Sequence, residues 1–352
     1  MTIRVIQWAT GGVGRAAVEA VVSHPDLELV GARVYSPDKV GRDVGELCGL
    51  EPLGVEATDD VDALLALEPD CCVYAPILPD EADLARLLRA GVNVVTPLGW
   101  FFQLPHESQG LRAAAEAGGA TLHGTGIHPG GVTERLPLVA SAFSRNITHV
   151  RAEEFSDIRS YGAPDVIRNI MLFGVPPEEA SGSFLPAILG NGFNQSISML
   201  AHALGFRVDE ERVVTHETAV ATAPIDSPIG VIEPGLVAAQ RISWQATVDG
   251  KPVITARVNW LMGEEHLDPA WSFGREGERF EVEVDGDPPT ELVIHGWHPD
   301  GVVANLDRNL GIVATGVHCV SAVPAVVAAP PGLVTYLDLP MVHGRAAPDL
   351  HR

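Results

Sequence analysis

The sequence predicts an α/β fold: an N-terminal Rossmann domain with a doubly wound parallel sheet, followed by an α+β domain with an antiparallel sheet. Three observations predict it. Apolar runs and helix-like segments alternate through the N-terminal third, and a glycine-rich turn follows the first apolar run. Strands in which every second residue is apolar appear only after about residue 150.

The parallel sheet is predicted from apolar runs bounded by turn residues. Because these runs are apolar throughout, their strands should be covered by helices on both faces, as in parallel sheets. The expected strands are residues 3–8, 27–34, 71–74, 92–95 and 120–123, and the expected helices are residues 15–23, 81–89 and 107–117.

The second part is predicted from period-2 patterns, in which one face of each strand is apolar. These patterns cover residues 242–248, 254–260 and 280–284, after helical segments at about 164–173 and 194–204. The opposite face is predicted to be moderately polar with few charges, which suits packing against a second subunit or, equally, contact with solvent.

Composition limits the class of partner. The 352 residues carry 23 Lys and Arg against 46 Asp and Glu, a net charge of −23, which argues against nucleic acid or anionic membranes as partners. The four cysteines form no CxxC or zinc pattern. Residues 311–337 carry no formal charge, but their prolines favour a buried helix followed by a strand over a membrane span. We therefore expect a cytoplasmic protein with a small-molecule substrate.

The turn after the first strand matches a dinucleotide-binding fingerprint with alanine in the first glycine place. It consists of Ala9, Thr10, Gly11, Gly12, Val13 and Gly14. Small residues allow a tight turn, close approach of the backbone to a pyrophosphate, and close packing of helix on strand. The following helix N-terminus would face the phosphates. An ordinary glycine-rich turn is the alternative.

The end of the second strand favours NADP over NAD. NAD sites usually place an acidic residue there for the ribose 2′-hydroxyl. Here Ser36 could donate to a 2′-phosphate and Lys39 could neutralise it, with Arg33 helping if it points outward. NAD stays possible, since Ser36 and Lys39 could simply form a polar turn. Further cofactor contacts are expected where later strands end, at Ala75, Pro76, Thr96 and Gly126.

Six segments of the chain together carry a family resemblance: residues 7–14, 36–46, 93–96, 124–130, 311–316 and 323–324. In these segments the chain resembles the dihydrodipicolinate reductase-like superfamily, in the branch of 2,4-diaminopentanoate dehydrogenase and the native amine dehydrogenases. This resemblance implies a Rossmann domain at residues 1–145, an α+β substrate and dimerisation domain at 146–305, and a C-terminal helix and strand that return to the Rossmann domain at 306–352. It also implies a homodimer and hydride transfer from NAD(P)H to an imine or carbonyl carbon.

One segment departs from that family. Amine-forming members are expected to carry a glutamate just after the fifth strand, where this chain reads Thr96-Pro97-Leu98-Gly99-Trp100-Phe101-Phe102. We interpret Trp100, Phe101 and Phe102 as an apolar wall of the substrate pocket, although three aromatics could also be ordinary core. The departure puts reductive amination with free ammonia in doubt.

The proton donor is expected to be His128 or Glu154. His128 follows a parallel strand, where such sheets bind ligands, and an imidazole titrates near neutral pH. It could instead only brace its Gly/Pro loop. Glu154 lies with Glu153 and Asp157 on a strand-like segment, where each could equally be a solvated or ion-paired carboxylate.

Other titratable residues carry weaker expectations. Glu134 starts a helix and is interpreted as structural, and Tyr161 is a further possible donor. We expect no metal, because His295 and His298 would point to opposite faces of an extended segment, and His123 with His128 lacks a third ligand.

The expected function is an NADP-dependent oxidoreductase that transfers hydride to a C=O or C=N carbon of a largely apolar small molecule. Two alternatives remain open: a true amine dehydrogenase whose acid is displaced, for example to Glu154, and a non-catalytic NADP-binding sensor.

Overall fold

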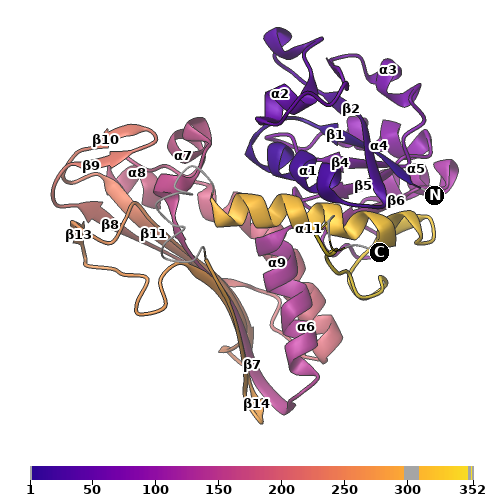
Figure 1. The fold of residues 1–352 in the computed structure, drawn as a ribbon. Coiled ribbons are helices and arrows are strands. Elements are labelled where there is room, and N and C mark those ends of the chain that lie inside the picture. Colours follow the sequence, from indigo (N-terminus) through magenta and orange to yellow (C-terminus); the bar gives the residue numbers. More distant parts are fainter. Residues whose placement is uncertain (1, 297–308, 348–349, 351–352) are drawn as a thin grey trace. The chain divides into compact units, whose positions relative to one another are not determined.

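The computed structural model describes residues 2–296, 309–347 and 350, which form two compact units (Figure 1). The first unit comprises Met1–Ile127 and Ile312–Arg352, and the second comprises His128–Gly311. The units therefore change at 127/128 and 311/312, whereas the sequence placed the first boundary at 145/146; the second predicted boundary, at 305/306, lies outside the described residues. The first boundary comes earlier because the helix at 136–141 packs on strands of the second sheet.

The first unit is built on a seven-stranded parallel sheet with the order β16-β6-β5-β4-β1-β2-β3. The strand order reverses at β1, which is the arrangement of a Rossmann fold. The strands are β1 (Ile3–Trp8), β2 (Leu27–Arg33), β3 (Ala57–Thr58), β4 (Cys71–Tyr74), β5 (Asn93–Thr96), β6 (Thr121–Gly124) and β16 (Gly332–Val334). The helices are α1 (Gly12–Ser23), η1 (Pro37–Lys39), α2 (Val44–Cys48), α3 (Val61–Leu65), α4 (Glu81–Arg89), α5 (Gln109–Gly118) and α11 (Leu310–Val327).

Helices cover both faces of this sheet, as predicted. Successive strand residues point to opposite faces, so Cys71 belongs to the core under α1 and α11, whereas Cys72 belongs to the core under α4 and α5. Two adjacent cysteines can therefore both be buried without pairing.

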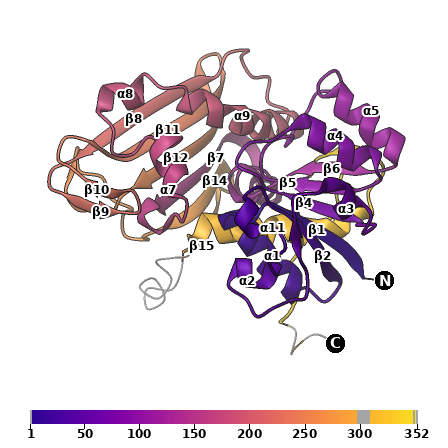
Figure 2. The same ribbon diagram turned by 90° about the horizontal axis from the view of Figure 1, so that it is seen from above.

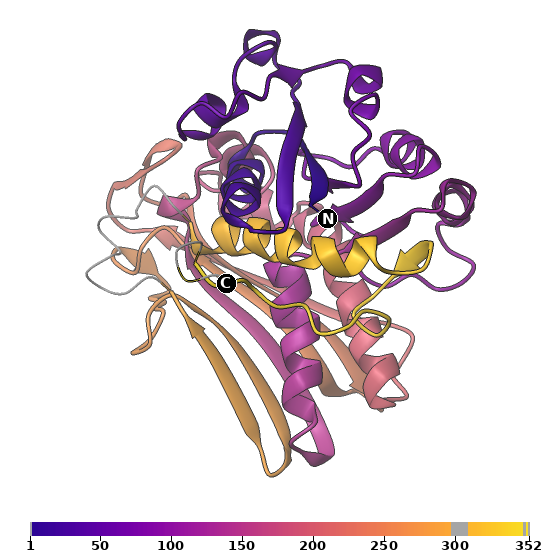
Figure 3. The same ribbon diagram turned by 45° about the vertical axis from the view of Figure 1, so that its right-hand side comes forward.

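Helix α11 lies beside α1 in the first unit, where Figure 3 shows it in yellow. Gly316 makes this approach possible, because a Cβ there would lie 2.8 Å from the Ala16 side chain and 2.9 Å from the Val13 carbonyl oxygen. In the described residues α11 is the one helix long and apolar enough to cross a membrane. Cys319, Val320 and Val323 of α11 are nevertheless buried in the core of this unit.

The second unit contains a seven-stranded sheet with the order β13-β8-β11-β12-β7-β14-β15, whose central strands lie side by side in Figure 2. Its strands are β7 (Arg145–Asp157), β8 (Val213–Ala221), β11 (Val237–Val248), β12 (Lys251–Leu261), β13 (Leu267–Asp268), β14 (Arg279–Asp287) and β15 (Thr290–His295), and β9 (Ile225–Ser227) pairs with β10 (Gly230–Ile232). The other elements are η2 (Ile127–Arg135), α6 (Leu136–Ser141), η3 (Ile158–Ser160), α7 (Pro164–Asn169), α8 (Pro177–Ser181) and α9 (Leu185–Leu204).

This sheet is antiparallel as predicted, except that β7 and β12 run parallel. The chain leaves β7 and returns to β12 only after passing through α9, β8 and β11, and a long connection of this kind permits parallel pairing. Helix α9 begins nine residues before the predicted start. The prediction missed its first part because Gly190 and Gly192 weaken the helical pattern there. Gly190 serves close packing, since a Cβ there would lie 2.8 Å from Trp244 Nε1.

The two faces of this sheet differ. Helices α6 and α9 pack against one face. The other face carries an ion network in which Arg151 pairs with Glu153, Glu281 and Glu283. The sequence predicted few charges on that face, but long-range pairing brings charged residues of β7 and β14 together.

Candidate active site

The turn between β1 and α1 has the geometry that its small residues predict. Ala9 adopts a φ of 74°, and its carbonyl oxygen accepts a hydrogen bond from Gln7 Nε2 at 3.0 Å. A Cβ on Gly14 would lie 2.1 Å from that oxygen, so no larger residue fits there without moving the turn. Close packing of α1 on β1 therefore depends on Gly14.

The start of α1 suits the phosphates of a dinucleotide. Gly11 is the N-cap, and no side chain caps the helix. A Cβ on Gly11 would have no neighbour within 4 Å, so the backbone is open to close approach. Uncapped N–H groups and the positive end of the helix dipole favour an anion at such a position. These residues fit a bound NAD(P).

The residues after β2 place one cation beside that turn. Lys39 Nζ donates to Thr10 Oγ1 at 3.4 Å, which brings the ammonium group to the phosphate-binding turn. Ser36 is the N-cap residue of η1, but its side chain makes no capping hydrogen bond. The Arg33 guanidinium lies over the Tyr35 ring, 5.1 Å from its centroid, and donates to the Val34 carbonyl oxygen at 2.7 Å.

The other predicted cofactor contacts follow neighbouring parallel strands. Ala75 and Pro76 follow β4, Thr96 ends β5, and Gly126 follows β6. Because the carboxyl ends of parallel strands share one edge of a sheet, these residues lie along the same edge as Ala9 and Ser36.

The predicted aromatic wall is largely buried. Trp100 belongs to the core cluster beneath α4 and α5, and Phe101 is buried. The Gly99 carbonyl oxygen would lie 2.0 Å from a Cβ on Gly124, so the β5 exit packs tightly on β6. The role of Trp100, Phe101 and Phe102 as a substrate wall stays a prediction.

The three acidic residues near the end of β7 lie in different environments. Glu153 is 2% exposed and ion-paired with Arg151 and Arg257. Both carboxylate oxygens of Asp157 accept hydrogen bonds from Arg159 Nε at 3.0 Å. Glu154 faces away from these cations, because successive residues of a strand point to opposite faces.

Glu154 is buried beside the aromatic side chains of Trp260 and Phe280. It is 9% exposed, and its Oε1 accepts hydrogen bonds from Ser156 Oγ at 2.6 Å and Trp260 Nε1 at 3.2 Å. In the part of the chain that the structure describes, no donor reaches its Oε2. Burial raises the pKa of Glu154 from its usual value to about 7, so its protonated and ionised forms are both accessible near neutral pH.

His128 is held as a neutral ring. Its Nε2 lies 3.0 Å from the Arg257 carbonyl oxygen and donates to it, so Nδ1 carries the lone pair. Nδ1 is buried and has no hydrogen-bond partner among the described residues. Burial lowers the pKa of His128 to about 4. Near neutral pH the ring can therefore accept a hydrogen bond at Nδ1 without taking up the proton, and the role of proton donor stays a prediction.

The sheet brings His128 and Glu154 to the same place. Glu154 lies between Phe280 on β14 and Val258 on β12. His128 contacts both flanking strands, through the Phe280 ring at 6.1 Å between centroids and through the carbonyl of Arg257. His128 and Glu154 thus share Phe280 as a neighbour, and each lies beside strands β12 and β14.

Sequence reasoning did not single out Ser156, Trp260 or Phe280 as site residues. Their only signal was the period-2 pattern, which places them on the same face as Glu154, but the partner strands were unknown. In the sequence, nothing distinguishes Trp260 from the other apolar residues of its strand. The pairing of β7 with β12 and β14 supplies the missing information.

Glu134 and Tyr161 are the remaining titratable candidates. Glu134 is fully buried and accepts a hydrogen bond from Ser196 Oγ, and burial raises its pKa well above its usual value. Burial raises the pKa of Tyr161 to about 12.

The described residues contain no group of side chains suited to binding a metal ion. Within residues 2–296, 309–347 and 350, no three His, Cys, Asp or Glu side chains are placed to hold a metal ion. His295 lies 3.8 Å from Glu276, and His298 lies outside the described residues. His123 Nδ1 donates to the Val334 carbonyl oxygen at 3.0 Å.

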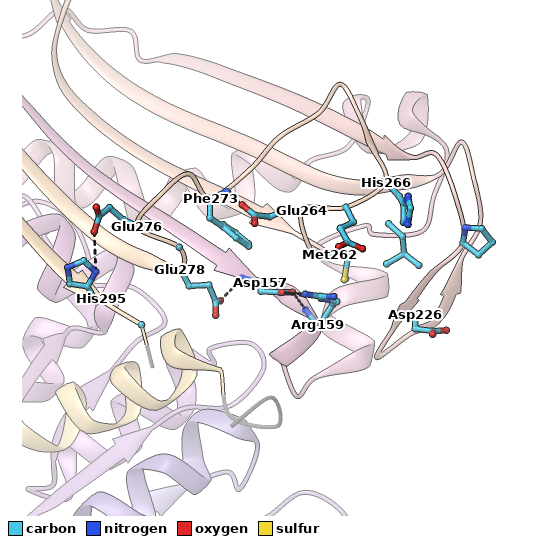
Figure 4. A pocket seen from close by; sticks show the side chains of 16 residues that line it. Asp157, Arg159, Asp226, Met262, Glu264, His266, Phe273, Glu276, Glu278 and His295 are labelled. Carbon is cyan, nitrogen blue, oxygen red and sulfur yellow. Dashed lines mark hydrogen bonds and ion pairs between the residues drawn. The ribbon is translucent and has the colours of Figure 1, made fainter. Parts of the chain in front are cut away.

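A cavity of about 1110 Å³ lies at the ends of β7, β12 and β15 in the second unit (Figure 4). Its wall combines carboxylates with a few apolar side chains. The lining side chains include Asp157, Arg159, Met262, Glu264, Phe273 and Glu278.

Comparison with protein families finds two matches. A model of the 2,4-diaminopentanoate dehydrogenase C-terminal domain matches residues 132–348, and a model of the dihydrodipicolinate reductase N-terminus matches residues 3–74.

Individual relatives agree with these matches. The chain is 34% identical to an amine dehydrogenase from Streptomyces virginiae, and the alignment covers 96% of each chain. It is 24% identical to 2,4-diaminopentanoate dehydrogenase from Acetoanaerobium sticklandii over 68% of this chain and 63% of that protein. The structure of an amine dehydrogenase from Mycobacterium smegmatis superimposes with a TM-score of 0.78 at 25% identity, covering 98% of both chains.

Proposed function

This chain belongs to the family of NAD(P)-dependent dehydrogenases that includes amine dehydrogenase and 2,4-diaminopentanoate dehydrogenase, and we propose that it acts on a carbon–nitrogen bond. The substrate would be a largely apolar small molecule, interconverted between an amine and the corresponding imine or ketone. NAD(P), when bound, exchanges the hydride with the carbon. Because the relatives are enzymes, the non-catalytic sensor that the sequence left open is set aside.

The observation that carries this proposal is the buried carboxyl of Glu154. The family's expected glutamate after β5 is replaced by the segment around Gly99, so another group must exchange a proton with the substrate nitrogen. Glu154 has the required pKa of about 7, and both of its hydrogen-bond donors among the described residues bind Oε1, which leaves Oε2 for the substrate nitrogen. We assign it as the acid in amine formation and as the base in amine oxidation.

His128 supports nitrogen over oxygen as the reacting heteroatom. An amine or iminium nitrogen brings N–H donors, and Nδ1 of His128 with Oε2 of Glu154 offers two acceptors. A carbonyl oxygen brings only acceptors, so His128 would repel it. We therefore infer that His128 Nδ1 orients the substrate nitrogen.

Reduction of a ketone without ammonia is the second candidate. The apolar segment Gly99–Phe102 favours it, because this segment lacks the carboxylate expected in amine-forming relatives. Protonated Glu154 could also donate to a carbonyl oxygen.

For the cofactor we propose NADP, based on Lys39 beside the phosphate-binding turn. The homodimer implied by the family resemblance and the cytoplasmic location expected from the composition also stay proposals.

The test is NADPH oxidation with hydrophobic ketones, each with and without high ammonium. We expect turnover that depends on ammonium and that falls at least a hundredfold in Glu154→Gln, since general acid–base catalysis contributes about 10²–10⁴-fold. Glu134→Gln is the matched control, because it changes another buried carboxyl that keeps its bond from Ser196.

Two results would change the assignment. Equal turnover with and without ammonium would favour the ketone reductase. Unchanged turnover in Glu154→Gln would remove Glu154 from the mechanism.

A further inference from the structure

The buried position of Glu154 raises the question of how its proton reaches water. At 9% exposure this carboxyl has little contact with solvent, yet each turnover of the proposed reaction requires it to gain and lose a proton. The following inference rests on the proposed function of Glu154.

Ser156 and Glu278 lie next to Glu154 through the pairing of β7 with β14. Phe280 pairs with Glu154 and Arg279 pairs with Phe155, so the next step of this antiparallel register places Glu278 opposite Ser156. Cβ atoms of opposite residues lie about 4.5–5.5 Å apart, within reach of a glutamate carboxyl.

Hydrogen bonds fix the two ends of this arrangement. Ser156 Oγ donates to Glu154 Oε1 at 2.6 Å. At the other end, the Asp157 N–H donates to Glu278 Oε2, so the Glu278 carboxyl lies against the peptide group that joins Ser156 to Asp157. Ser156 is itself buried. The Ser156 hydroxyl therefore donates to one buried carboxyl, and the strand register places it opposite the residue that carries the second carboxyl.

Glu278 opens onto the cavity shown in Figure 4, where its side chain points toward Asp157. It is half-buried, in contrast to Glu154. The charged groups around it are Asp157 with its partner Arg159, and the cavity also holds Glu276 with His295. The cavity is large enough to contain many water molecules, which could exchange protons with Glu278.

We propose that Ser156 and Glu278 form a proton relay between Glu154 and the cavity. In the direction of amine formation, Ser156 Oγ gives its proton to Glu154 Oε1 and takes one from Glu278, which is then reprotonated by water in the cavity. The reverse sequence carries a proton out after amine oxidation. Both residues act through Glu154, so they are positioning residues that do not touch the substrate.

The proton affinities of the two carboxyls support this relay. Burial raises the pKa of Glu278 to about 7, and it also raises that of Glu154 to about 7, with a further increase from the nearby charge of Glu278. A proton can therefore move in either direction without a large difference in free energy.

The first test compares Ser156→Ala and Glu278→Gln with wild type during turnover of NADPH, a ketone and ammonium. We expect kcat to fall roughly tenfold, less than for loss of the acid itself, with KM unchanged and a larger solvent deuterium isotope effect. Imidazole buffer should restore part of kcat, and Glu278→Asp should retain most of it.

Glu276→Gln is the control, since this residue lines the same cavity without contacting the 156–157 peptide. The Gln variant at 278 can still accept the Asp157 N–H, so the local fold should survive. Wild-type kcat, isotope effect and buffer dependence in both relay variants would overturn the proposal.

A second measurement needs no substrate. Infrared spectroscopy of the protein with NADP⁺ would follow the carboxylic acid band of Glu154, identified by its loss in Glu154→Gln. We expect Glu278→Gln to lower the pH at which this band titrates, and Ser156→Ala to slow its hydrogen–deuterium exchange. An unaltered exchange rate in Ser156→Ala would overturn the relay.

The two hypotheses fail separately. If Glu154→Gln keeps full turnover, the proposed role of Glu154 is wrong. If Glu154→Gln is inactive while Ser156→Ala and Glu278→Gln behave like wild type, only the relay is wrong.

Discussion

At the scale of single residues, the protonation of each carboxyl is decided by its neighbours. Glu153 and Glu154 are adjacent, but one is surrounded by arginines and the other by Trp260 and Phe280. Desolvation without a cation favours the neutral acid, which explains why burial raises the pKa of Glu154. This contrast separates a structural ion pair from a group that can exchange protons at neutral pH.

The same reasoning predicts the pH dependence of the reaction. Glu154 must carry a proton when the enzyme forms an amine, so kcat in that direction should be highest below about pH 7 and should fall as pH rises through the pKa. In amine oxidation the dependence should be reversed. Measuring kcat from pH 5 to 9 in both directions checks this, and parallel profiles in the two directions would contradict it.

Glu134 provides a prediction about stability. Its raised folded-state pKa means that the unfolded chain releases this proton at a lower pH than the folded chain does. Wild-type stability should therefore decrease as pH rises above the ordinary glutamate pKa. Glu134→Gln should be more stable than wild type at pH 8, with a smaller difference at pH 5, as measured by urea unfolding.

Turnover of Glu134→Gln should stay at the wild-type level, because its amide can still accept the Ser196 hydroxyl. A large loss of kcat would instead give Glu134 a part in catalysis.

Lys39 provides a prediction about the cofactor. Lys39→Glu should lower the NADPH to NADH preference by about tenfold or more, since a charged hydrogen bond contributes ~1.5–3 kcal/mol. The measurement is kcat/KM for each cofactor. Lys251→Glu at the exposed start of β12 is the control, and an unchanged ratio in Lys39→Glu would remove Lys39 and weaken the case for NADP.

At the scale of elements, two glycines of the turn between β1 and α1 have different expected roles, one in the fold and one in cofactor binding. Gly14→Ala should lower the melting temperature and abolish NADPH binding, because its Cβ would overlap the Ala9 carbonyl oxygen. Gly11→Ala should leave the melting temperature unchanged and weaken NADPH binding, because its Cβ would occupy space open to the pyrophosphate. Calorimetric titration with NADPH and thermal unfolding check both variants. Equal effects of the two changes would mean that Gly11 also matters for the fold.

Several elements follow from local sequence and others do not. The strands at 3–8 and 71–74 and the helix at 81–89 occur at the predicted residues, because apolar runs and turn residues define them locally. The full extent of α9 and the parallel pairing of β7 with β12 depend on contacts between distant residues, namely Gly190 with Trp244 and β7 with β12.

At the scale of the whole molecule, cofactor binding and proton transfer are assigned to different units. The residues that fit NAD(P) belong to the first unit, whereas Glu154 and His128 belong to the second. Binding of NADP⁺ should therefore increase hydrogen-exchange protection most strongly at the β1–α1 turn and after β2. Strands β8 and β11, at the far side of the second sheet from β14, should change least. Mass spectrometry of exchange with and without NADP⁺ measures this, and equal protection in β8 would contradict the division.

The sequence by itself determined the fold class, the cofactor turn and the family, because each depends on short stretches whose chemistry is local. A tight turn requires small residues in consecutive positions, and a buried parallel strand requires a continuous apolar run. The departure at Gly99–Phe102 was visible for the same reason.

Only the tertiary structure decided which acidic residue could act in catalysis. Glu153, Glu154 and Asp157 look alike in the sequence, and their proton affinities depend on strands β12 and β14, which lie more than a hundred residues away along the chain. The tautomer of His128 depends in the same way on a carbonyl group of β12. Electrostatics act through space, so the charge state of a buried group is set by the neighbours that folding brings to it.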